Sequence, residues 1–131
     1  MPQIGKALLD TSVVIPYMKG DAAIRAQIQQ VTTLCLPITA AGELYCGAYT
    51  SQFRARLLVE IKNFLKGVVL LTHRESTAEI YGEIRAELAK AGTPIPENDI
   101  WIAALAKEEG IPLATRDAHF QRVKGINILA W

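Results

Sequence analysis

Five short, continuously apolar segments recur along the chain, and longer segments with helical patterns separate them. The apolar segments cover residues 6–9, 34–36, 68–71, 113–115 and 126–129. Strands without polar alternation are typical of parallel sheets, because helices cover both faces of such sheets. The pattern therefore predicts an α/β fold, in which helices flank both faces of a central, mostly parallel sheet of about five strands.

The segments between these strands are expected to form helices. They cover residues 12–19, 22–31, 38–52, 54–66, 75–91 and 97–109. Ile80, Ile84 and Leu88 recur at helical spacing, so the helix at 75–91 is amphipathic. The helix at 97–109 is apolar nearly all round, which predicts that it is buried on more than one side.

The composition fits one globular domain covering residues 1–131. Fourteen basic and 13 acidic side chains give a net charge of +1, so the total indicates no strongly basic nucleic-acid surface, although a local patch is compatible with it. Cys35 and Cys46 lie in apolar segments and are expected to be buried free thiols, which suits a cytoplasmic protein. We expect no leader peptide and no membrane-spanning segment, because no uncharged apolar run is long enough.

Four acidic residues occur where the fold would bring them to one edge of the sheet. Asp10 directly follows the first strand, and Asp117 follows the fourth strand after one residue. Asp99 lies near the start of the helix before that strand, and Glu43 lies in the apolar helix after the second strand. Functional residues of open α/β sheets gather at the carboxyl ends of the strands, so we expect these four side chains to meet there.

Each acid also has a structural explanation when it is taken alone. Asp10 could cap the following helix, as we expect Asp21 to cap the next one. Asp99 could complement the positive end of its helix dipole, and Asp117 could initiate a turn. For Glu43, a functional explanation is favoured over a structural one, because its neighbours are apolar and an unpaired buried charge is costly.

A cluster of these four carboxylates would be unfavourable without a cation, because like charges raise each other's pKa. Ligand sets made of oxygen select hard divalent ions such as Mg²⁺ or Mn²⁺. Mg²⁺ keeps several waters and leaves room for phosphate oxygens. The chemistry that such a site supports is attack of metal-activated water on a phosphodiester.

Four segments around these acids resemble the acidic motifs of the PIN-domain nucleases, and they occur in that family's order. The segments are LLDTSVVI at 8–15, AGEL at 41–44, PENDIWIAA at 96–104 and ATRDAHF at 114–120. The resemblance extends from Leu8 to about Ile128. Among PIN proteins, a single domain of this size is most similar to the VapC toxins of toxin–antitoxin pairs.

The resemblance implies a role for each matching residue. Asp10, Asp99 and Asp117 match the aspartates that hold the metal, and Glu43 matches the glutamate that helps to position the attacking water. Ser12 and Thr115 match hydroxyl residues that support the acids, and Asn98 matches a polar position beside the third acid. The four acids are thus the catalytic and metal-binding candidates.

The resemblance also implies what the protein does and with what it interacts. The implied activity is that of a Mg²⁺- or Mn²⁺-dependent endoribonuclease, a hydrolase of RNA phosphodiester bonds and the toxin of a type II toxin–antitoxin pair. The implied partners are an RNA substrate, a cognate VapB-like antitoxin and a second copy of the chain in a homodimer, with no membrane. From the residues alone, we expect Arg116 beside Asp117 to contact a substrate phosphate.

Other functions remain open on the sequence alone. The main alternative is a non-catalytic RNA-binding or regulatory PIN domain. A phosphatase with an aspartyl nucleophile is disfavoured, since no second aspartate stands two residues after Asp10. A dinucleotide enzyme is disfavoured as well, because no Gly-x-Gly-x-x-Gly follows a strand. His119, two residues after Asp117, is expected to be a surface or structural residue rather than a general base.

Overall fold

The sheet holds five strands, all parallel, in a computed structural model that describes residues 3–131. The strands are β1 (Ile4–Leu9), β2 (Val31–Pro37), β3 (Val69–Leu71), β4 (Leu113–Thr115) and β5 (Ile128–Ala130). Their order across the sheet is β3-β2-β1-β4-β5. The expected α/β fold with a parallel sheet is confirmed.

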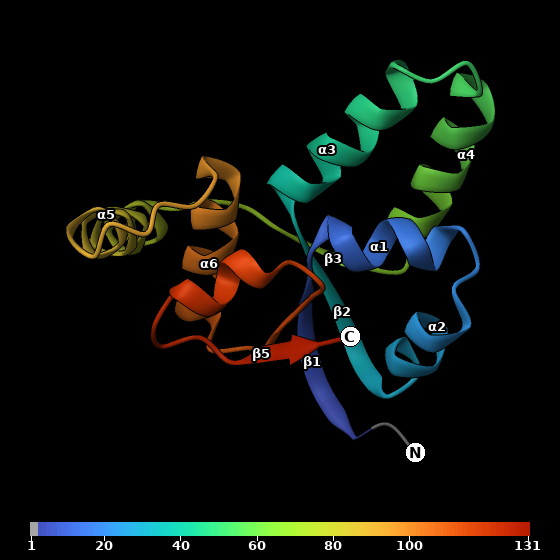
Figure 1. Cartoon of the computed structure of the whole chain (residues 1–131). Helices are drawn as coiled ribbons and strands as arrows, with labels where there is room; N and C mark the ends of the chain where they lie inside the picture. Colours follow the sequence, from blue (N-terminus) through green and yellow to red (C-terminus); the bar gives the residue numbers. More distant parts are fainter. Residues whose placement is uncertain (1–2) are drawn as a thin grey trace.

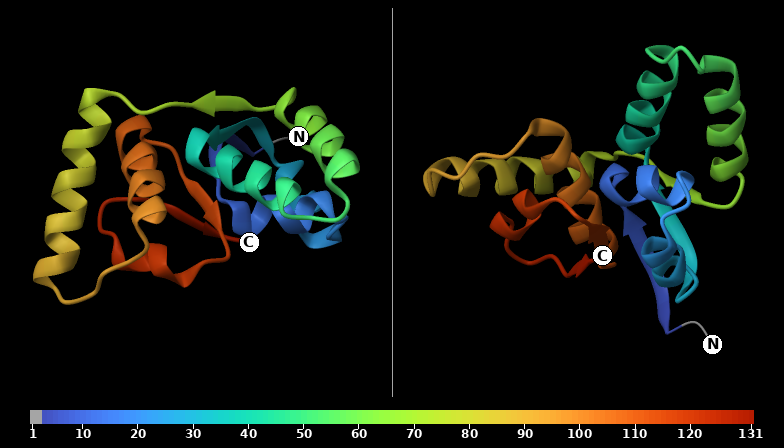
Figure 2. Two further views of the ribbon diagram at one scale, coloured as in Figure 1. Left: turned by 90° about the horizontal axis from the view of Figure 1, so that it is seen from above. Right: turned by 45° about the vertical axis from the view of Figure 1, so that its right-hand side comes forward.

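Helices cover both faces of this sheet (Figure 1). They are α1 (Thr11–Met18), α2 (Ala22–Ile28), α3 (Ile38–Tyr49), α4 (Arg54–Leu65), α5 (Glu75–Lys90), α6 (Glu97–Glu109) and the short 3₁₀ helix η1 (Ala118–Arg122). The first four pack on one face, whereas α5, α6 and η1 lie on the other. Figure 2, seen from above, places α5 beside α6 at one end of the molecule and α3 beside α4 at the other.

Neighbouring residues of the central strand β1 pack into the two halves of the core, one on each face of the sheet. Successive side chains of a strand point to opposite faces. Leu8 therefore packs with the residues of α5 and α6, whereas Leu9 packs with Val13 of α1 and with α3. Both leucines are fully buried, and burial of such a side chain contributes about 1.5–3 kcal/mol. This packing explains why the strands carry no polar alternation.

Some boundaries and one burial differ from the expectation. The helix expected at 22–31 ends at Ile28, because Val31 pairs with Ile4 and already belongs to β2. The last strand begins at Ile128 rather than at residue 126. Cys35 is buried as expected, but the expected burial of Cys46 is wrong, because its side of α3 faces solvent.

The order of the strands creates a point where the chain changes direction. From β1 the chain steps outward to β2 and β3, and it then crosses to β4 on the other side of β1. The carboxyl ends of β1 and β4 therefore border the crevice in which ligands of open α/β sheets bind. No helix among residues 3–131 is long and apolar enough to cross a membrane.

Candidate functional site

Asp10 lies at the carboxyl end of β1 and is 4% exposed. It occupies the N-cap position of α1, yet its side chain makes no capping hydrogen bond there. Instead, its Oδ2 accepts hydrogen bonds from Ser12 Oγ at 2.7 Å and from Thr115 Oγ1 at 2.9 Å. Asp21, by contrast, caps α2 as expected and accepts from the backbone N–H of Ile24. A capping role therefore does not account for Asp10.

Two hydroxyl groups join the end of β1 to the end of β4. Thr115 Oγ1, which donates to Asp10, also accepts a hydrogen bond from the backbone N–H of Asp117 at 2.9 Å. Ser12 Oγ accepts one from the backbone N–H of Arg116 at 2.9 Å. Ser12 and Thr115 thus hold the first and last acids in fixed relative positions.

Asp117 and Asp99 approach this edge from two further elements. Asp117 follows β4 and caps η1, where its Oδ1 accepts from the backbone N–H of His119 at 2.9 Å. Asp99 lies in the first turn of α6, and its side chain is 14% exposed. The turn expected at Asp117 is thus present, and within residues 3–131 no hydrogen bond engages its Oδ2, which is available to a ligand.

The charges of the four acids act on one another. Burial raises the pKa of Asp99 to about 6, with further increases from the carboxylates of Asp117 and Asp10 and a smaller one from Glu43. Burial also raises the pKa of Glu43, and the negative charge of Asp10 adds to the effect. Glu43 nevertheless remains accessible from solvent on α3. The four acids therefore share one edge of the sheet and repel each other there.

The structure adds His119 to this group. Its Nδ1 lies 3.0 Å from Asp117 Oδ1 and 3.8 Å from Asp99 Oδ2. This nitrogen is buried and makes no hydrogen bond within residues 3–131. In the sequence, only the spacing of two residues from Asp117 indicated that His119 could lie near the acids. In the structure, the helical turn of η1 brings it there. The sequence led us to expect a surface or structural residue rather than a general base, and the structure places its imidazole beside two of the acids.

The residues of this edge fit a divalent cation. One ligand atom each from Asp99, Asp117 and His119 can be chosen so that all three lie within 4.8 Å of one another. The carboxylates offer hard oxygen ligands, and the orphaned Nδ1 is a further potential ligand. A cation would also offset the repulsion that raises the pKa of Asp99.

Two other expected site residues make no recorded contact with the acids. Arg116 turns its guanidinium toward the chain terminus, where Nε donates to Trp131 O at 3.0 Å and Nη2 lies 3.2 Å from Asp21 Oδ2. Asn98 is exposed in the first turn of α6, and no hydrogen bond of its side chain is recorded within residues 3–131. A phosphate contact for Arg116 and a supporting role for Asn98 stay predictions.

Thr11 is a residue that the sequence argument missed. Its hydroxyl lowers the pKa of Glu43 and so opposes the effect of burial. The residue begins α1, directly after Asp10. No pattern in the sequence distinguished it from an ordinary first residue of a helix.

Comparisons with known proteins agree with this architecture. A family model described as "PIN domain" matches residues 7–126. "Ribonuclease VapC2" of Haemophilus influenzae is 35% identical over 129 residues, which cover 96% of this chain and 98% of that protein. "tRNA(fMet)-specific endonuclease VapC" of Shigella flexneri is 32% identical with the same coverage.

Solved structures give a similar result. The chain superimposes with a TM-score of 0.89 on a chain of DNA-bound VapBC from Salmonella typhimurium, with 31% identity and coverage of 96% and 98%. It superimposes with a TM-score of 0.88 on a chain of VapBC-1 from nontypeable Haemophilus influenzae, with 29% identity and the same coverage.

Proposed function

This chain belongs to the PIN domain family, and on that premise we propose that it is a metal-dependent endoribonuclease, the toxin of a type II toxin–antitoxin pair. Residues 1–131 would form one PIN domain. The observation that supports the proposal most directly is the edge of the sheet at which burial raises the pKa of Asp99 and of Glu43. The charges of Asp117, Asp10 and Glu43 add to the effect on Asp99, and that of Asp10 adds to the effect on Glu43. Such a group of acids disfavours a purely structural role.

The three aspartates and Glu43 would hold the cation, which we propose to be Mg²⁺ or Mn²⁺. A divalent ion bound there supplies Lewis-acid stabilisation of a phosphodiester and lowers the pKa of water at neutral pH. His119 Nδ1, 3.0 Å from Asp117 Oδ1, lies close enough to join or orient this ligand set.

The remaining residues prepare the site. Ser12 and Thr115 donate to Asp10 Oδ2 and fix the direction of its other oxygen. The Glu43 carboxylate is accessible and has a raised pKa, so it is suited to orient an attacking water and to accept its proton. Asn98 supports Asp99 from the same helical turn, and Arg116 binds a phosphate of the substrate.

The proposed partners follow from the relatives. Several are named as ribonucleases, and the Shigella flexneri relative is named as a tRNA(fMet)-specific endonuclease. The similar solved structures are VapBC complexes. We therefore propose an RNA substrate and a VapB-like antitoxin for this chain. From the resemblance to VapC toxins we propose a homodimeric state, and a cytoplasmic location is proposed with it.

The test is cleavage of end-labelled total RNA by the purified chain, refolded from denaturant to remove any bound antitoxin. Wild type, Asp99→Asn and Glu83→Gln are compared with Mg²⁺, with Mn²⁺ and with chelator. Glu83 is the matched control, because it is an exposed glutamate of α5 for which no ion pair is recorded in residues 3–131. We expect discrete, metal-dependent products from wild type and Glu83→Gln only.

Circular dichroism of each variant separates loss of activity from loss of fold. A folded wild type that binds RNA without cutting it would contradict the nuclease and support the alternative, a non-catalytic RNA-binding or regulatory PIN domain.

A further inference from the structure

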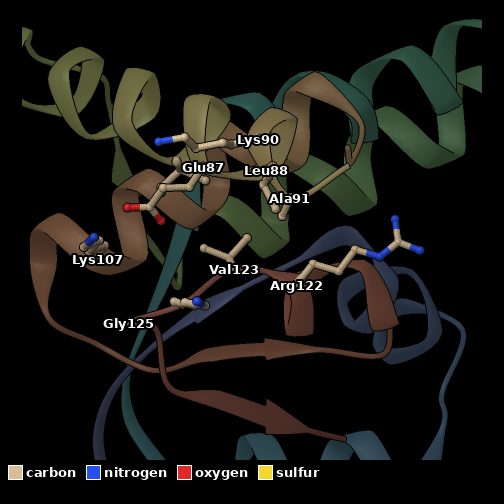
Figure 3. Close-up of a pocket in the computed structure, with 10 residues that line it drawn as sticks. Glu87, Leu88, Lys90, Ala91, Lys107, Arg122, Val123 and Gly125 are labelled. Atoms are coloured by element: carbon tan, nitrogen blue, oxygen red, sulfur yellow. The ribbon is translucent and has the colours of Figure 1, made fainter. Parts of the chain in front are cut away.

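A pocket of about 570 Å³ lies between the C-terminal half of α5, the C-terminal half of α6 and the segment that follows η1. Figure 3 shows Glu87, Lys90 and Leu88 reaching it from α5, with Lys107 at one end and Arg122 at the other. Neither the metal ligands nor any other proposed catalytic residue lines it. The pocket is therefore separate from the acidic edge.

Positive charge dominates the rim of this pocket. Lys90, Lys107, Arg122 and Lys124 line it, whereas Glu87 is its one acidic residue. Within residues 3–131, no ion pair is recorded for any of the four basic residues. The whole chain has a net charge of only +1, so this rim concentrates positive charge that its own fold does not neutralise.

The floor of the pocket is built to hold these cations near one another. Buried Ile84, Leu88 and Val123 form an apolar base along which lysine stems can lie. Lys107 is held close to the backbone of Gly125, where a Cβ would lie 3.6 Å from its Cε. Gly125 has a φ of 82°, a conformation that favours glycine, and this turn brings Lys124 to the same rim.

One short helix connects the pocket with the acidic edge. Asp117 precedes η1 and Arg122 ends it, and a 3₁₀ helix rises about 2 Å per residue, so the two Cα atoms lie about 10 Å apart along the chain. Arg122 Nη1 also donates to Pro94 O at 2.9 Å, in the loop that leads to Asp99 on α6. An extended nucleic-acid strand that starts at the acids can therefore reach the pocket within a few nucleotides.

We propose that this pocket binds backbone phosphates of the RNA strand whose scissile bond lies at the acidic edge. The inference rests on the proposed nuclease function and adds a second contact for the substrate. Unpaired lysines and an arginine are suited to phosphate oxygens, and release of counterions from the nucleic acid favours the contact. The acids by themselves repel a polyanion, so a basic surface nearby offsets that repulsion.

The test measures RNA affinity without cleavage. All proteins carry Asp99→Asn, and the probe is a fluorescein-labelled, mixed-sequence, single-stranded RNA oligonucleotide followed by anisotropy over a range of salt concentrations. The pocket variant is Lys90→Gln, Lys107→Gln and Lys124→Gln combined. The matched control is Lys6→Gln, Lys62→Gln and Lys66→Gln combined, which has the same net charge and changes no residue of the pocket.

We expect the pocket variant to bind the RNA at least about tenfold more weakly at low salt than the control variant. Each phosphate contact of a single strand adds about 0.7 to the steepness of the plot of log K against log salt, so three lost contacts reduce it by about 2. Equal affinity and equal salt dependence in the two variants would overturn the proposal.

Two further outcomes are distinguishable. If the pocket variant loses binding of a polyglutamate probe but keeps its affinity for RNA, the pocket is a protein-binding surface and the proposal is wrong. RNA cleavage by the chain with Asp99 intact is measured separately. If this chain cuts RNA and the pocket variant binds RNA as tightly as the control variant, the pocket proposal is wrong and the nuclease proposal stands. A chain that cuts no RNA while the pocket lysines control RNA affinity supports the pocket and counts against the nuclease.

Discussion

The hydroxyl of Thr115 donates a hydrogen bond to Asp10 Oδ2 at 2.9 Å, although 105 positions separate the two residues in the chain. The same Thr115 oxygen accepts a hydrogen bond from the backbone N–H of Asp117. One buried side chain at the end of β4 therefore sets the positions of two acids that belong to different parts of the sequence. This link joins the stability of the fold to the geometry of the site.

Replacing Thr115 with valine should lower the stability of the fold and disturb the geometry of the acidic site. Valine has nearly the same shape, but it leaves the Asp117 N–H without its partner and removes one of the two hydrogen bonds that Asp10 Oδ2 accepts. This loss costs about 1–3 kcal/mol in the free energy of unfolding. Urea denaturation measures this loss, and Thr115→Ser should recover most of it. Thr32→Val, at an exposed position of β2, is the control and should change stability by less than about 0.5 kcal/mol. A Thr115→Val protein as stable as wild type would contradict the link.

Asp99→Asn should stabilise the metal-free protein at neutral pH while abolishing cleavage. The pKa of Asp99 is raised from its ordinary 3.8 to about 6, so the folded state holds this proton more tightly than the unfolded state does. Stability from Asp99 is therefore greatest at low pH and is lost as the pH rises between these two values. Asparagine removes the repelled charge, and we expect a gain of about 1–3 kcal/mol in chelator.

Thermal melts in chelator at several pH values check this expectation. The wild-type melting temperature should fall relative to that of Asp99→Asn as the pH rises from about 4 to about 6. Glu83→Gln, which removes an exposed charge, should follow the wild-type curve. If the melting temperatures of wild type and Asp99→Asn change in parallel with pH, the Asp99 carboxylate is not repelled by its neighbours in the folded state.

Metal binding should weaken in acid. The ligands must be deprotonated to bind a cation, and Asp99 gains a proton below about pH 6. The apparent affinity for Mn²⁺, measured by calorimetry, should fall by up to about tenfold for each pH unit below that point. An affinity that stays constant across this range would exclude Asp99 from the ligand set.

Arg116→Gln should lower RNA affinity at low salt, because a guanidinium beside Asp117 can contact a phosphate. Its ion pair with Asp21 is partly exposed and contributes little to stability, so it can open when substrate binds. Asp21→Asn, which frees the guanidinium, should leave RNA affinity equal or higher. Unchanged affinity in Arg116→Gln would assign Arg116 a structural role toward Asp21 and Trp131.

The fold could be predicted largely from the sequence because the sheet is buried on both faces. Apolar strands such as 113–115 can pack in few other ways, and α6 was expected at the residues that it occupies. The errors lie where pairing overrides local preference. Val31 follows a helical pattern, but it joins β2 because Ile4 offers a partner that only the folded chain supplies.

The grouping of the four acids could also be predicted, because the carboxyl ends of parallel strands meet at one edge. The contacts among the side chains of the site could not be predicted from the sequence. The link from Thr115 to Asp10 depends on the register of β1 and β4, and the approach of His119 to Asp99 depends on the turn of η1. Arg116 stands beside an acid in the sequence, yet its side chain points to Asp21.

A titration of Mg²⁺ or Mn²⁺ into chelator-stripped protein tests the metal-dependent nuclease most directly, with the rate of RNA cleavage and the melting temperature followed in the same samples. A cation bound at the acids stabilises the folded state and switches on cleavage together. We expect the cleavage rate and the melting temperature to rise with one midpoint in wild type, and neither to respond in Asp99→Asn. Cleavage that continues at its full rate in excess chelator would contradict this expectation.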